Sequence, residues 1–365
     1  MRRPLSIRTA SLSAYRLPLR DLWLSAAGGC AQREGWLLRL ESEDGRCGYG
    51  DCAPLALIGT ESLAQAEAAL GERLKGIIGA SVDTALAALQ RPTTTHTPAV
   101  HCALECALLD LQAQAINLPL RRYLAPGAGD EVIVNAALGS PMQVDDQSIL
   151  KACAQGFSVL KFKVGNAPLD DELERLCHIV ALLPPGVQLR LDANRAWSEA
   201  EATRFITHCA DWPIDLFEEP LADAHPNALQ RLQASCAFPL ALDESWPGTI
   251  ALDEFFSAPT VRRLVLKLPR IGGLLPALAL ARRASAAGIE CIVTSSIDSA
   301  CGVLAAAQLA AAIASETGSQ IAHGLATCSW LAEDLGAAPL ISEGRLQLPS
   351  AAGLGFVPSR NDGFR

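Results

Sequence analysis

Hydrophobic and polar positions alternate with a period of two at the start of the chain and with a helical period soon afterwards. Short alternating runs predict strands over 7–16, 35–41 and 47–51, and the Asp44-Gly45 pair between the last two predicts a hairpin turn. Apolar residues three and four apart then predict helices over 62–74 and 82–89. A small antiparallel sheet followed by helices is an α+β unit, which we expect to span residues 1–95.

From residue 96 onward, short apolar runs alternate with amphipathic helical patterns at intervals of about 25 residues. This alternation predicts parallel strands, and seven or eight such units close into a barrel, whereas an open doubly wound sheet is the competing architecture. We expect the second domain to span 96–344, joined to the first by the polar stretch 91–95, with 345–365 packing back on the first domain. The predicted strands cover 132–137, 159–164, 187–192, 214–219, 239–243, 263–267 and 290–295.

Charged residues stand at the carboxyl ends of five consecutive predicted strands. In a barrel these ends meet at one rim, whereas an open sheet spreads them along a line at about 4.8 Å per strand. A shared rim lets all five side chains serve one small ligand. The chain is therefore predicted to be an α/β protein with a (β/α)8-type barrel, in a (β/α)7β variant, and a smaller α+β capping domain. The five residues are Lys163, Asp192, Glu218, Asp243 and Lys267.

Composition narrows the class of protein. The net charge is −9 and no basic cluster exceeds two residues, which argues against nucleic acid as a partner. The charged N-terminus lacks a following apolar run and no apolar stretch reaches 18 residues, so we expect no secretory signal, no membrane span and a cytoplasmic location. The 12 cysteines are scattered without a C-x-x-C motif, which favours free thiols. His101, Cys102 and Cys106 lie on one core-like helix, where packing is favoured over zinc binding.

Three carboxylates, Asp192, Glu218 and Asp243, come from successive strands. They cannot be buried together in ionised form without a cation. Oxygen ligands with no nearby histidine or cysteine suit Mg²⁺, with Mn²⁺ as a substitute. Taken singly, Asp192 or Asp243 could instead cap a helix, but all three in register favour a metal site.

Lysines occupy the strands on either side of the three carboxylates. Lys161 and Lys163 share one face of their strand, which indicates a polar cavity unless this strand lies at a sheet edge facing water. A divalent ion between lysines is suited to removing a proton next to a substrate carboxylate, because a buried lysine near other cations is a workable base. Arg190 shares the inward face and could hold a substrate anion or a ligand carboxylate. Asn194 and Glu219 are expected to support the metal ligands.

These motifs resemble the enolase superfamily, in its muconate-lactonising-enzyme subgroup. The resemblance rests on Lys-x-Lys at 161–163, Leu-Asp-Ala-Asn at 191–194, Glu-Glu-Pro at 218–220, Leu-Asp-Glu-Ser at 242–245 and Lys-x-Pro at 267–269. Within the subgroup, the runs 189–197, 294–302 and 323–335 are most similar to the o-succinylbenzoate synthase family, and 33–36 and 48–55 resemble its capping domain.

The resemblance implies roles for individual residues. Lys163 would remove the α-proton beside Lys161, and Lys267 would stabilise the intermediate across the substrate ring. Asp192, Glu218 and Asp243 would bind Mg²⁺, and Ser295 and Ser296 would meet a substrate carboxylate through backbone N–H groups. The implied lyase reaction converts a small acidic substrate, 2-succinyl-6-hydroxy-2,4-cyclohexadiene-1-carboxylate, to 2-succinylbenzoate in menaquinone or phylloquinone biosynthesis.

Three alternatives stay open at this point. An N-succinylamino-acid racemase would use lysines on both faces of the substrate, and so would a dipeptide epimerase. Such epimerases tend to carry Asp-x-Asp on the last barrel strand, where this chain has His-Gly-Leu-Ala-Thr at 323–327. A non-catalytic ligand-binding barrel is the alternative from another class. The run Lys-Leu-Pro-Arg at 267–270 departs from the usual Lys-Pro-Thr, His323 has no assigned role, and the loops 25–29 and 57–61 are candidate lids.

Overall fold

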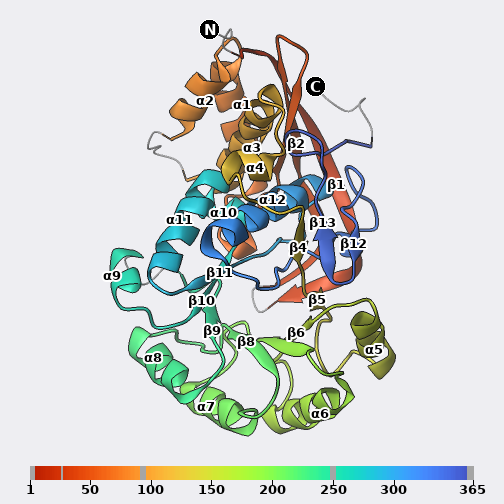
Figure 1. Ribbon diagram of the computed structural model, residues 1–365, viewed down its shortest axis with the longest axis vertical. Coiled ribbons are helices and arrows are strands. Elements are labelled where there is room, and N and C mark those ends of the chain that lie inside the picture. The colour runs from red at the N-terminus through yellow and green to blue at the C-terminus, as the bar shows by residue number, and fades with distance from the viewer. Residues whose placement is uncertain (1–4, 26–27, 91–95, 247–251, 360–365) are drawn as a thin grey trace.

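The computed structural model describes residues 5–25, 28–90, 96–246 and 252–359. Its first part is an antiparallel sheet of β1 (Ile7–Ser25), β2 (Gly28–Ser42) and β3 (Cys47–Cys52), with β2 in the middle (Figure 1). The predicted Asp44-Gly45 turn joins β2 to β3, and Gly45 has the positive φ of 86° that such a turn requires. Strand β1 is longer than predicted because pairing with β2 resumes at Trp23, after a register shift that begins at Pro18.

Helices cover one face of this sheet. The tightest contact is between β3 and α3, because a Cβ atom on Gly50 would lie 2.0 Å from the carbonyl oxygen of Ala103. Only glycine therefore fits there. The predicted helices over 62–74 and 82–89 are confirmed, each with a serine cap at Ser62 or Ser81. The elements are η1 (Ala56–Ile58), α1 (Leu63–Ile77), α2 (Val82–Leu89), α3 (Pro98–Ala115) and α4 (Leu120–Leu124).

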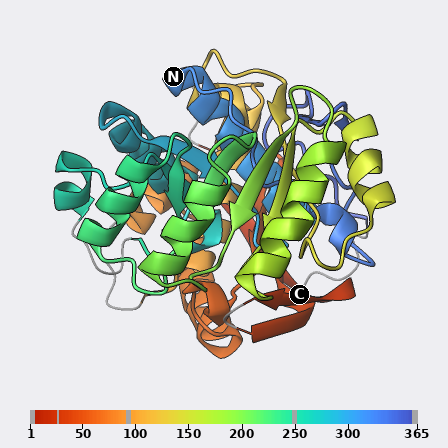
Figure 2. The same ribbon diagram turned by 90° about the horizontal axis from the view of Figure 1, so that it is seen from below.

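The second part is a parallel sheet of seven strands in chain order, with helices on its outside (Figures 1 and 2). The strands are β5 (Ala136–Ala137), β6 (Val159–Lys163), β7 (Gln188–Asp192), β8 (Ile214–Glu218), β9 (Leu240–Leu242), β10 (Arg263–Leu266) and β11 (Glu290–Val293). The helices are α5 (Asp146–Ala154), α6 (Leu169–Leu182), α7 (Glu199–His208), α8 (Pro226–Ser235), α9 (Leu252–Ser257), α10 (Leu268–Ile271), α11 (Leu274–Ala286) and α12 (Ala300–Thr317).

The segment around His323 and Gly324 closes the barrel. His323 pairs in parallel with Val134 on one side, and Gly324 pairs in parallel with Thr294 on the other. The His323 N–H donates to Ile133 at 2.8 Å, and the Gly324 N–H donates to Val293 at 3.0 Å. The (β/α)7β barrel with a separate capping part is therefore confirmed, and the open doubly wound sheet is excluded.

The predicted strand over 132–137 is divided in the structure. Its first half, β4 (Glu131–Ile133), leaves the barrel and pairs with β13 (Arg345–Gln347), which also pairs with β12 (Ile341–Ser342). A short η2 turn (Cys328–Trp330) precedes these strands. Further on, the Leu354 N–H donates to Asp110 of α3, and the Phe356 ring meets that of Tyr49 at 5.5 Å. The proposed joint 91–95 lies outside the described residues, so the domain boundary at 95 stays a prediction.

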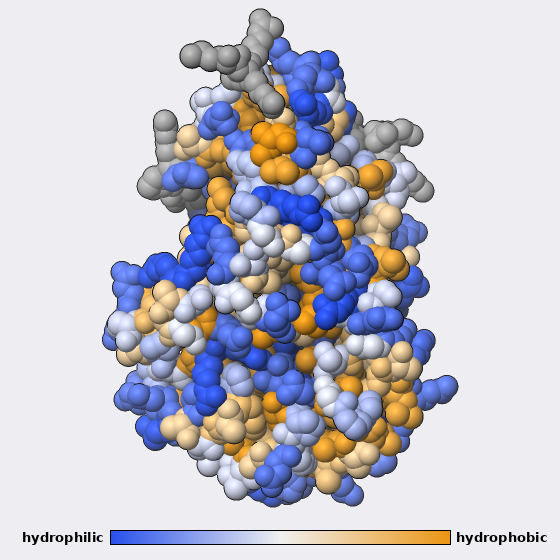
Figure 3. Space-filling view, in the orientation of Figure 1, coloured by the Kyte–Doolittle hydropathy of each residue, from blue (hydrophilic) through white to orange (hydrophobic). Residues whose placement is uncertain are grey.

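Helix α12 is long and apolar enough to cross a membrane by length and composition alone. However, 72% of that window is buried inside the protein, as expected of a core helix. Large exposed apolar side chains come from separate segments, such as Ile78, Leu150 and Val357. On the face seen in Figure 3, hydrophobic and hydrophilic side chains are interspersed.

All 12 cysteines are free, as predicted. Seven are buried, among them Cys102 and Cys106 of α3, and burial raises the pKa of both thiols well above the usual value. Cys177, which lies in an apolar run, is nevertheless exposed. Across the described residues, no cluster of three His, Cys, Asp or Glu side chains is arranged to hold a metal ion.

Candidate active site

The five charged residues predicted at the rim do lie together at the carboxyl ends of the strands. Lys163 pairs in register with Asp192, and Asp192 pairs with Glu218, so three of them end adjacent strands β6, β7 and β8. Asp243 and Lys267 follow directly on the last residues of β9 and β10. Lys163 and Lys267 thus come from strands that flank those bearing the carboxylates.

Lys161 joins two of the carboxylates. Its Nζ lies 2.6 Å from Glu218 Oε2 and 2.9 Å from Asp192 Oδ2, and both acid side chains are 3% exposed. Burial, then the nearby Asp192, raises the pKa of Glu218 to about 7, although Lys161 opposes this shift. Burial alone would lower the pKa of Lys161, but Asp192 and Glu218 outweigh it and hold that pKa above the usual range. Lys161 is therefore a charged partner of the carboxylates rather than a base.

The pKa of Lys163 is shifted in the opposite direction to that of Lys161. Its Nζ donates to Asn194 Oδ1 at 2.7 Å, and the Asn194 N–H donates to Asp192 Oδ1 at 3.1 Å. Burial, together with the charges of Lys161 and Lys267, lowers the pKa of Lys163 against the opposing effect of Asp192. A lowered pKa makes the neutral amine accessible, which is the form that can accept a proton.

Two cations hold Asp243. The Lys267 ammonium bonds to Oδ2, and Arg270 Nη2 donates to the Asp243 carbonyl at 2.7 Å. Arg270 Nη1 lies 3.0 Å from Oδ1 but without hydrogen-bond geometry, so this buried oxygen accepts no hydrogen bond. Although burial opposes the shift, Lys267 and Arg270 lower the pKa of Asp243 to about 2. Asp243 is therefore ionised at neutral pH.

Glu219 fixes the loop that follows β9. Its carboxyl oxygens accept from the N–H groups of Asp243 at 2.7 Å and Ser245 at 2.9 Å, and from the Ser245 hydroxyl at 2.6 Å. Burial, then Glu244, raises the pKa of Glu219 to about 8. Asn194 and Glu219 thus lie where the sequence predicts them, each next to a carboxylate of the rim.

The donor set suits a hard divalent cation in its chemistry. It consists of three buried carboxylates without sulfur or imidazole, and one oxygen, Asp243 Oδ1, lacks a hydrogen bond. The arrangement itself is not that of a formed metal site, because the Lys161 ammonium occupies the space between Asp192 and Glu218 and no metal-binding triad exists among the described residues. Lys161 contacts one oxygen of Asp192 and one of Glu218, which leaves the second oxygen of each carboxylate outside these two contacts.

Comparison with protein families supplies the observation that decides the class. The family described as "Enolase C-terminal domain-like" matches residues 146–362, which is more than half of the chain, and that described as "MenC, N-terminal domain" matches residues 7–111. The chain belongs to the enolase superfamily.

Relatives within the superfamily have several activities. The hydrophobic dipeptide epimerase of Enterococcus faecalis is 28% identical over 96% of this chain and 99% of its own. The L-Ala-D/L-Glu epimerase of Bacillus subtilis is 30% identical over 82% and 83%, and the o-succinylbenzoate synthase of Thermosynechococcus vestitus is 31% identical over 69% and 78%. These names leave the reaction of this superfamily member open.

Solved structures agree with the fold over nearly the whole chain. A substrate-liganded complex of the B. subtilis epimerase has a TM-score of 0.85 at 27% identity, covering 97% of this chain and 99% of its own. The dipeptide epimerase of E. faecalis complexed with Mg and L-Leu-L-Tyr has a TM-score of 0.83 at 26% identity, covering 96% and 99%. Both of these superfamily members are thus solved with a small ligand, and the E. faecalis epimerase with Mg as well.

The substrate contact expected of Arg190 stays a prediction, and in this structure its side chain bonds within the protein. Its side chain is 1% exposed and donates twice to Asp215 Oδ2, at 2.9 and 2.7 Å, and also to Asn135 Oδ1 and the Ala322 carbonyl. Arg190 does face into the barrel of this superfamily member, but it lies two residues deeper than Asp192. Its ion pair with Asp215 on the next strand fills the barrel interior.

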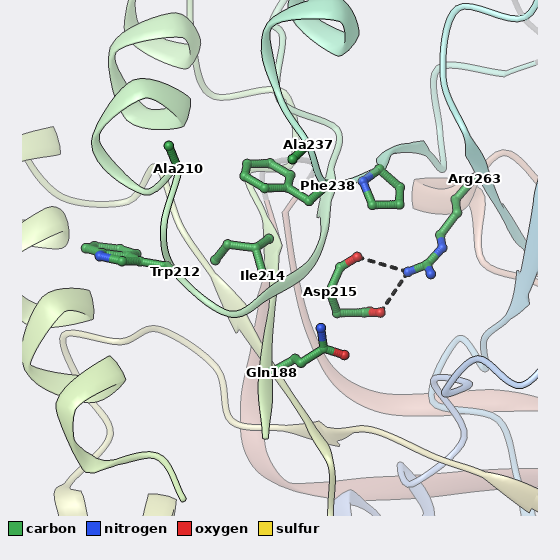
Figure 4. A pocket seen from close by; sticks show the side chains of 9 residues that line it. Gln188, Ala210, Trp212, Ile214, Asp215, Ala237, Phe238 and Arg263 are labelled. Carbon is green, nitrogen blue, oxygen red and sulfur yellow. Dashed lines mark hydrogen bonds and ion pairs between the residues drawn. The ribbon is translucent and has the colours of Figure 1, made fainter. Parts of the chain in front are cut away.

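Asp215 links this buried network to the opposite end of the barrel. Arg263 Nη1 donates to Asp215 Oδ1 at 2.7 Å and to its carbonyl oxygen at 3.1 Å, as Figure 4 shows. The cavity drawn there has a volume of about 370 Å³ and lies among residues at or near the amino ends of the strands, including Ile214 and Phe238. It lies at the end away from the rim, where barrel residues serve stability rather than catalysis.

The contact expected between a substrate carboxylate and the backbone N–H groups of Ser295 and Ser296 also stays a prediction, because both groups bond within the protein in this structure. The Ser295 N–H donates to the Gly324 carbonyl at 3.0 Å, and the Ser296 N–H donates to Asp298 Oδ2 at 3.0 Å. Both donors are therefore already bonded. The Ser295 hydroxyl instead bonds to Thr327 Oγ1 at 2.5 Å, whereas the buried Ser296 hydroxyl has no hydrogen-bond partner.

His323 is buried in the segment that closes the barrel. His323 Nδ1 accepts from the Val293 N–H at 3.1 Å, and burial, then Arg190, lowers the pKa of His323 to about 3, so it is a neutral structural residue.

Arg270 is a site residue that the sequence reasoning missed. Its signal was the Lys-Leu-Pro-Arg run, in which a proline-initiated turn brings Arg270 back over the rim beside Lys267. The lid candidate 25–29 lies partly outside the described residues, since 26–27 are not described.

Proposed function

We propose that this chain is an o-succinylbenzoate synthase, which dehydrates 2-succinyl-6-hydroxy-2,4-cyclohexadiene-1-carboxylate to 2-succinylbenzoate in menaquinone or phylloquinone biosynthesis. The MenC N-terminal-domain match and the 31% identical relative with that activity support the proposal. The observation that carries it is the position of Lys163 and Lys267 on the strands that flank three buried carboxylates. A cytoplasmic location agrees with it, because the cysteines are free thiols.

Asp192, Glu218 and Asp243 would hold Mg²⁺, or Mn²⁺ in its place. When bound, the cation offsets the negative charge that develops on the substrate carboxylate as the α-proton leaves. The hydrogen-bond-free oxygen of Asp243 supports this assignment. A cation bound there would lie close to the Lys161 ammonium, because this ammonium contacts both Asp192 and Glu218.

Lys163 would serve as base and then as acid. Its neutral amine accepts the proton as the C–H bond breaks, and its ammonium then donates that proton to the departing hydroxyl group as the C–O bond breaks, so that water leaves and the ring becomes aromatic. The lowered pKa of Lys163 favours the first step. Asn194, which accepts from Nζ at 2.7 Å, would orient the amine.

Lys267 would act by its charge from the other side of the substrate. Its Nζ contacts the buried Asp243 from the strand next to it, and a positive charge there would stabilise the negative charge that develops on the substrate. One base on one face is sufficient for a dehydration in which the proton and the hydroxyl group leave on the same face. Epimerisation needs a proton donor and an acceptor on opposite faces, and Lys163 and Lys267 could also supply that pair, so the substrate has to separate the two reactions.

Epimerisation or racemisation is the second candidate, because two of the relatives described above are dipeptide epimerases. The residues after the closing strand argue against a dipeptide substrate. The run 323–327 contains no carboxylate to pair with the ammonium of a dipeptide, and its Thr327 bonds to Ser295. N-succinylamino acids lack that ammonium and are not opposed by this argument.

Parallel assays of the purified chain with Mg²⁺ would separate these functions. Loss of diene absorbance from the cyclohexadiene substrate is expected, with no change in optical rotation of dipeptides or N-succinylamino acids. Rotation changes without dehydration would establish an epimerase or racemase instead. Turnover of none of these substrates, with Mg²⁺ binding intact, would favour a non-catalytic barrel.

A further inference from the structure

We infer that His101 is a positioning residue, which as a doubly protonated imidazolium ties the turn after Lys267 to the end of α2. The inference rests on the proposed function only in that Lys267 acts on the substrate. His101 lies on α3, outside the site described above, and its ring bridges two parts of the chain.

Both ring nitrogens of His101 face carbonyl oxygens. Nε2 lies 2.9 Å from the carbonyl oxygen of Leu89, the last residue of α2, and Nδ1 contacts the carbonyl oxygen of Gly272. A carbonyl oxygen only accepts hydrogen bonds, and a neutral imidazole has one N–H. Both contacts are therefore hydrogen bonds only when both nitrogens carry protons, whereas the neutral ring sets a nitrogen lone pair against an oxygen.

Glu105, one helical turn after His101, holds the other side of the same turn. It is 2% exposed, and its Oε2 accepts from the Leu275 N–H at 3.0 Å at the start of α11. A Cβ atom on Gly273 would lie 2.3 Å from this oxygen, so the glycine lets the carboxylate approach. His101 and Glu105 thus contact the backbone on either side of Gly273, at the Gly272 carbonyl and at the Leu275 N–H.

The clamped turn carries two residues of the rim. Lys267 and Gly272 flank the single-turn helix α10, whose backbone bonds include Ile271 N–H to Lys267 and Gly272 N–H to Leu268. This one turn is short and hydrogen-bonded, so displacement of Gly272 moves Lys267 and the Arg270 that holds Asp243. Small displacements of a catalytic group lower the rate of chemistry more than they weaken binding.

Other charged groups on the elements packed near His101 have partners of their own. Arg73 of α1 donates to Thr97, Glu61 accepts from the first N–H groups of α3, and Arg270 of α10 donates to Asp243.

Matched substitutions at His101 separate positioning from stability. Asparagine retains a donor near Nδ1, towards Gly272, whereas glutamine retains one near Nε2, towards Leu89. We expect His101→Asn to retain kcat within about threefold, and His101→Gln and His101→Leu to lose kcat by roughly 10- to 100-fold with KM within twofold. Asn and Gln variants with equal kcat losses that follow their Tm values would overturn the inference.

The ring nitrogens give a test that does not depend on the reaction. In the full chain labelled with ¹⁵N-histidine, the signals that disappear in His101→Asn should show two protonated nitrogens at pH 7. A neutral ring at pH 7 would refute the clamp whatever the enzyme catalyses. If the spectrum is as expected but dehydration is absent, the proposed function alone fails, and the kcat comparison is made on the substrate that the wild type converts.

Discussion

Replacing Arg190 by methionine tests whether this residue belongs to the barrel interior or to substrate binding. The side chain is 1% exposed, and its guanidinium donates hydrogen bonds to Asp215, Asn135 and Ala322, all within the protein. Methionine retains the packing of the aliphatic stem but leaves these acceptors without their donor. If Arg190 is structural, the variant should be less stable and should bind substrate normally.

The expected loss follows from the burial of the ion pair. Removing one partner of a buried pair costs about 3–5 kcal/mol, and the lower end applies here because Asp215 retains its bond to Arg263. At about 2–4 °C per kcal/mol for a domain of this size, a loss of about 3 kcal/mol should lower Tm by roughly 6–12 °C. Differential scanning calorimetry measures the stability change, and initial rates at saturating and limiting substrate give kcat and KM.

Arg204 provides a matched control, because its pair with Asp170 has side chains that are 59% and 71% exposed. The same change to methionine there should leave Tm within about 1 °C of the wild type, since exposed pairs contribute little. A tenfold rise in KM for Arg190→Met with an unchanged Tm would refute the structural assignment and restore the substrate contact predicted from the sequence.

Three further predictions concern the rim and the closing strand. Lys163→Ala should lower kcat by about 10²–10⁴-fold while circular dichroism and Mg²⁺ binding stay unchanged, and retained turnover would show that another group is the base. Asp243→Asn should weaken Mg²⁺ binding in isothermal titration calorimetry, and chelation by EDTA should abolish activity until Mg²⁺ is restored; unchanged affinity would exclude Asp243 as a ligand. The pKa of His323 is lowered to about 3 in the fold, so the unfolded chain alone takes up a proton as pH falls below about 6.5, and this group should cost about 1.4 kcal/mol per pH unit between pH 6 and 4. His323→Asn, which retains an acceptor for the Val293 N–H, should show a shallower decline of Tm with acid; an equal slope would contradict the assignment.

The rim could be predicted from the sequence because two local signals agree there. The period of two tells which side chains face inward, and the regular strand spacing brings the strand ends to one level. Asp192 and Glu218 follow from these signals alone. The same signals do not tell how deep a side chain lies inside the barrel. Arg190 faces inward like Asp192, but it lies in a lower layer, and its partner there, Asp215, comes from another strand.

Contacts between distant segments account for other features that the sequence does not reveal. The strand predicted over 132–137 divides because Val132 pairs with Leu346, a partner that no local pattern reveals. The Ser295 N–H is taken by Gly324 of the closing segment for the same reason. The bond from the Ser296 N–H to Asp298 is local, and the aspartate two residues on was a visible signal for such a turn.

The pairing of His323 with Val134 has a consequence for how the chain is made. On a ribosome adding 5–20 residues per second, the first barrel strand waits roughly 10–40 s before its missing neighbour is synthesised. Throughout that interval the growing sheet has two unpaired edges, which are templates for association with other chains. A nascent polypeptide ending before residue 321 should therefore depend on chaperones and aggregate in their absence. In the completed polypeptide, the segment around His323 and Gly324 pairs with both edges of the sheet.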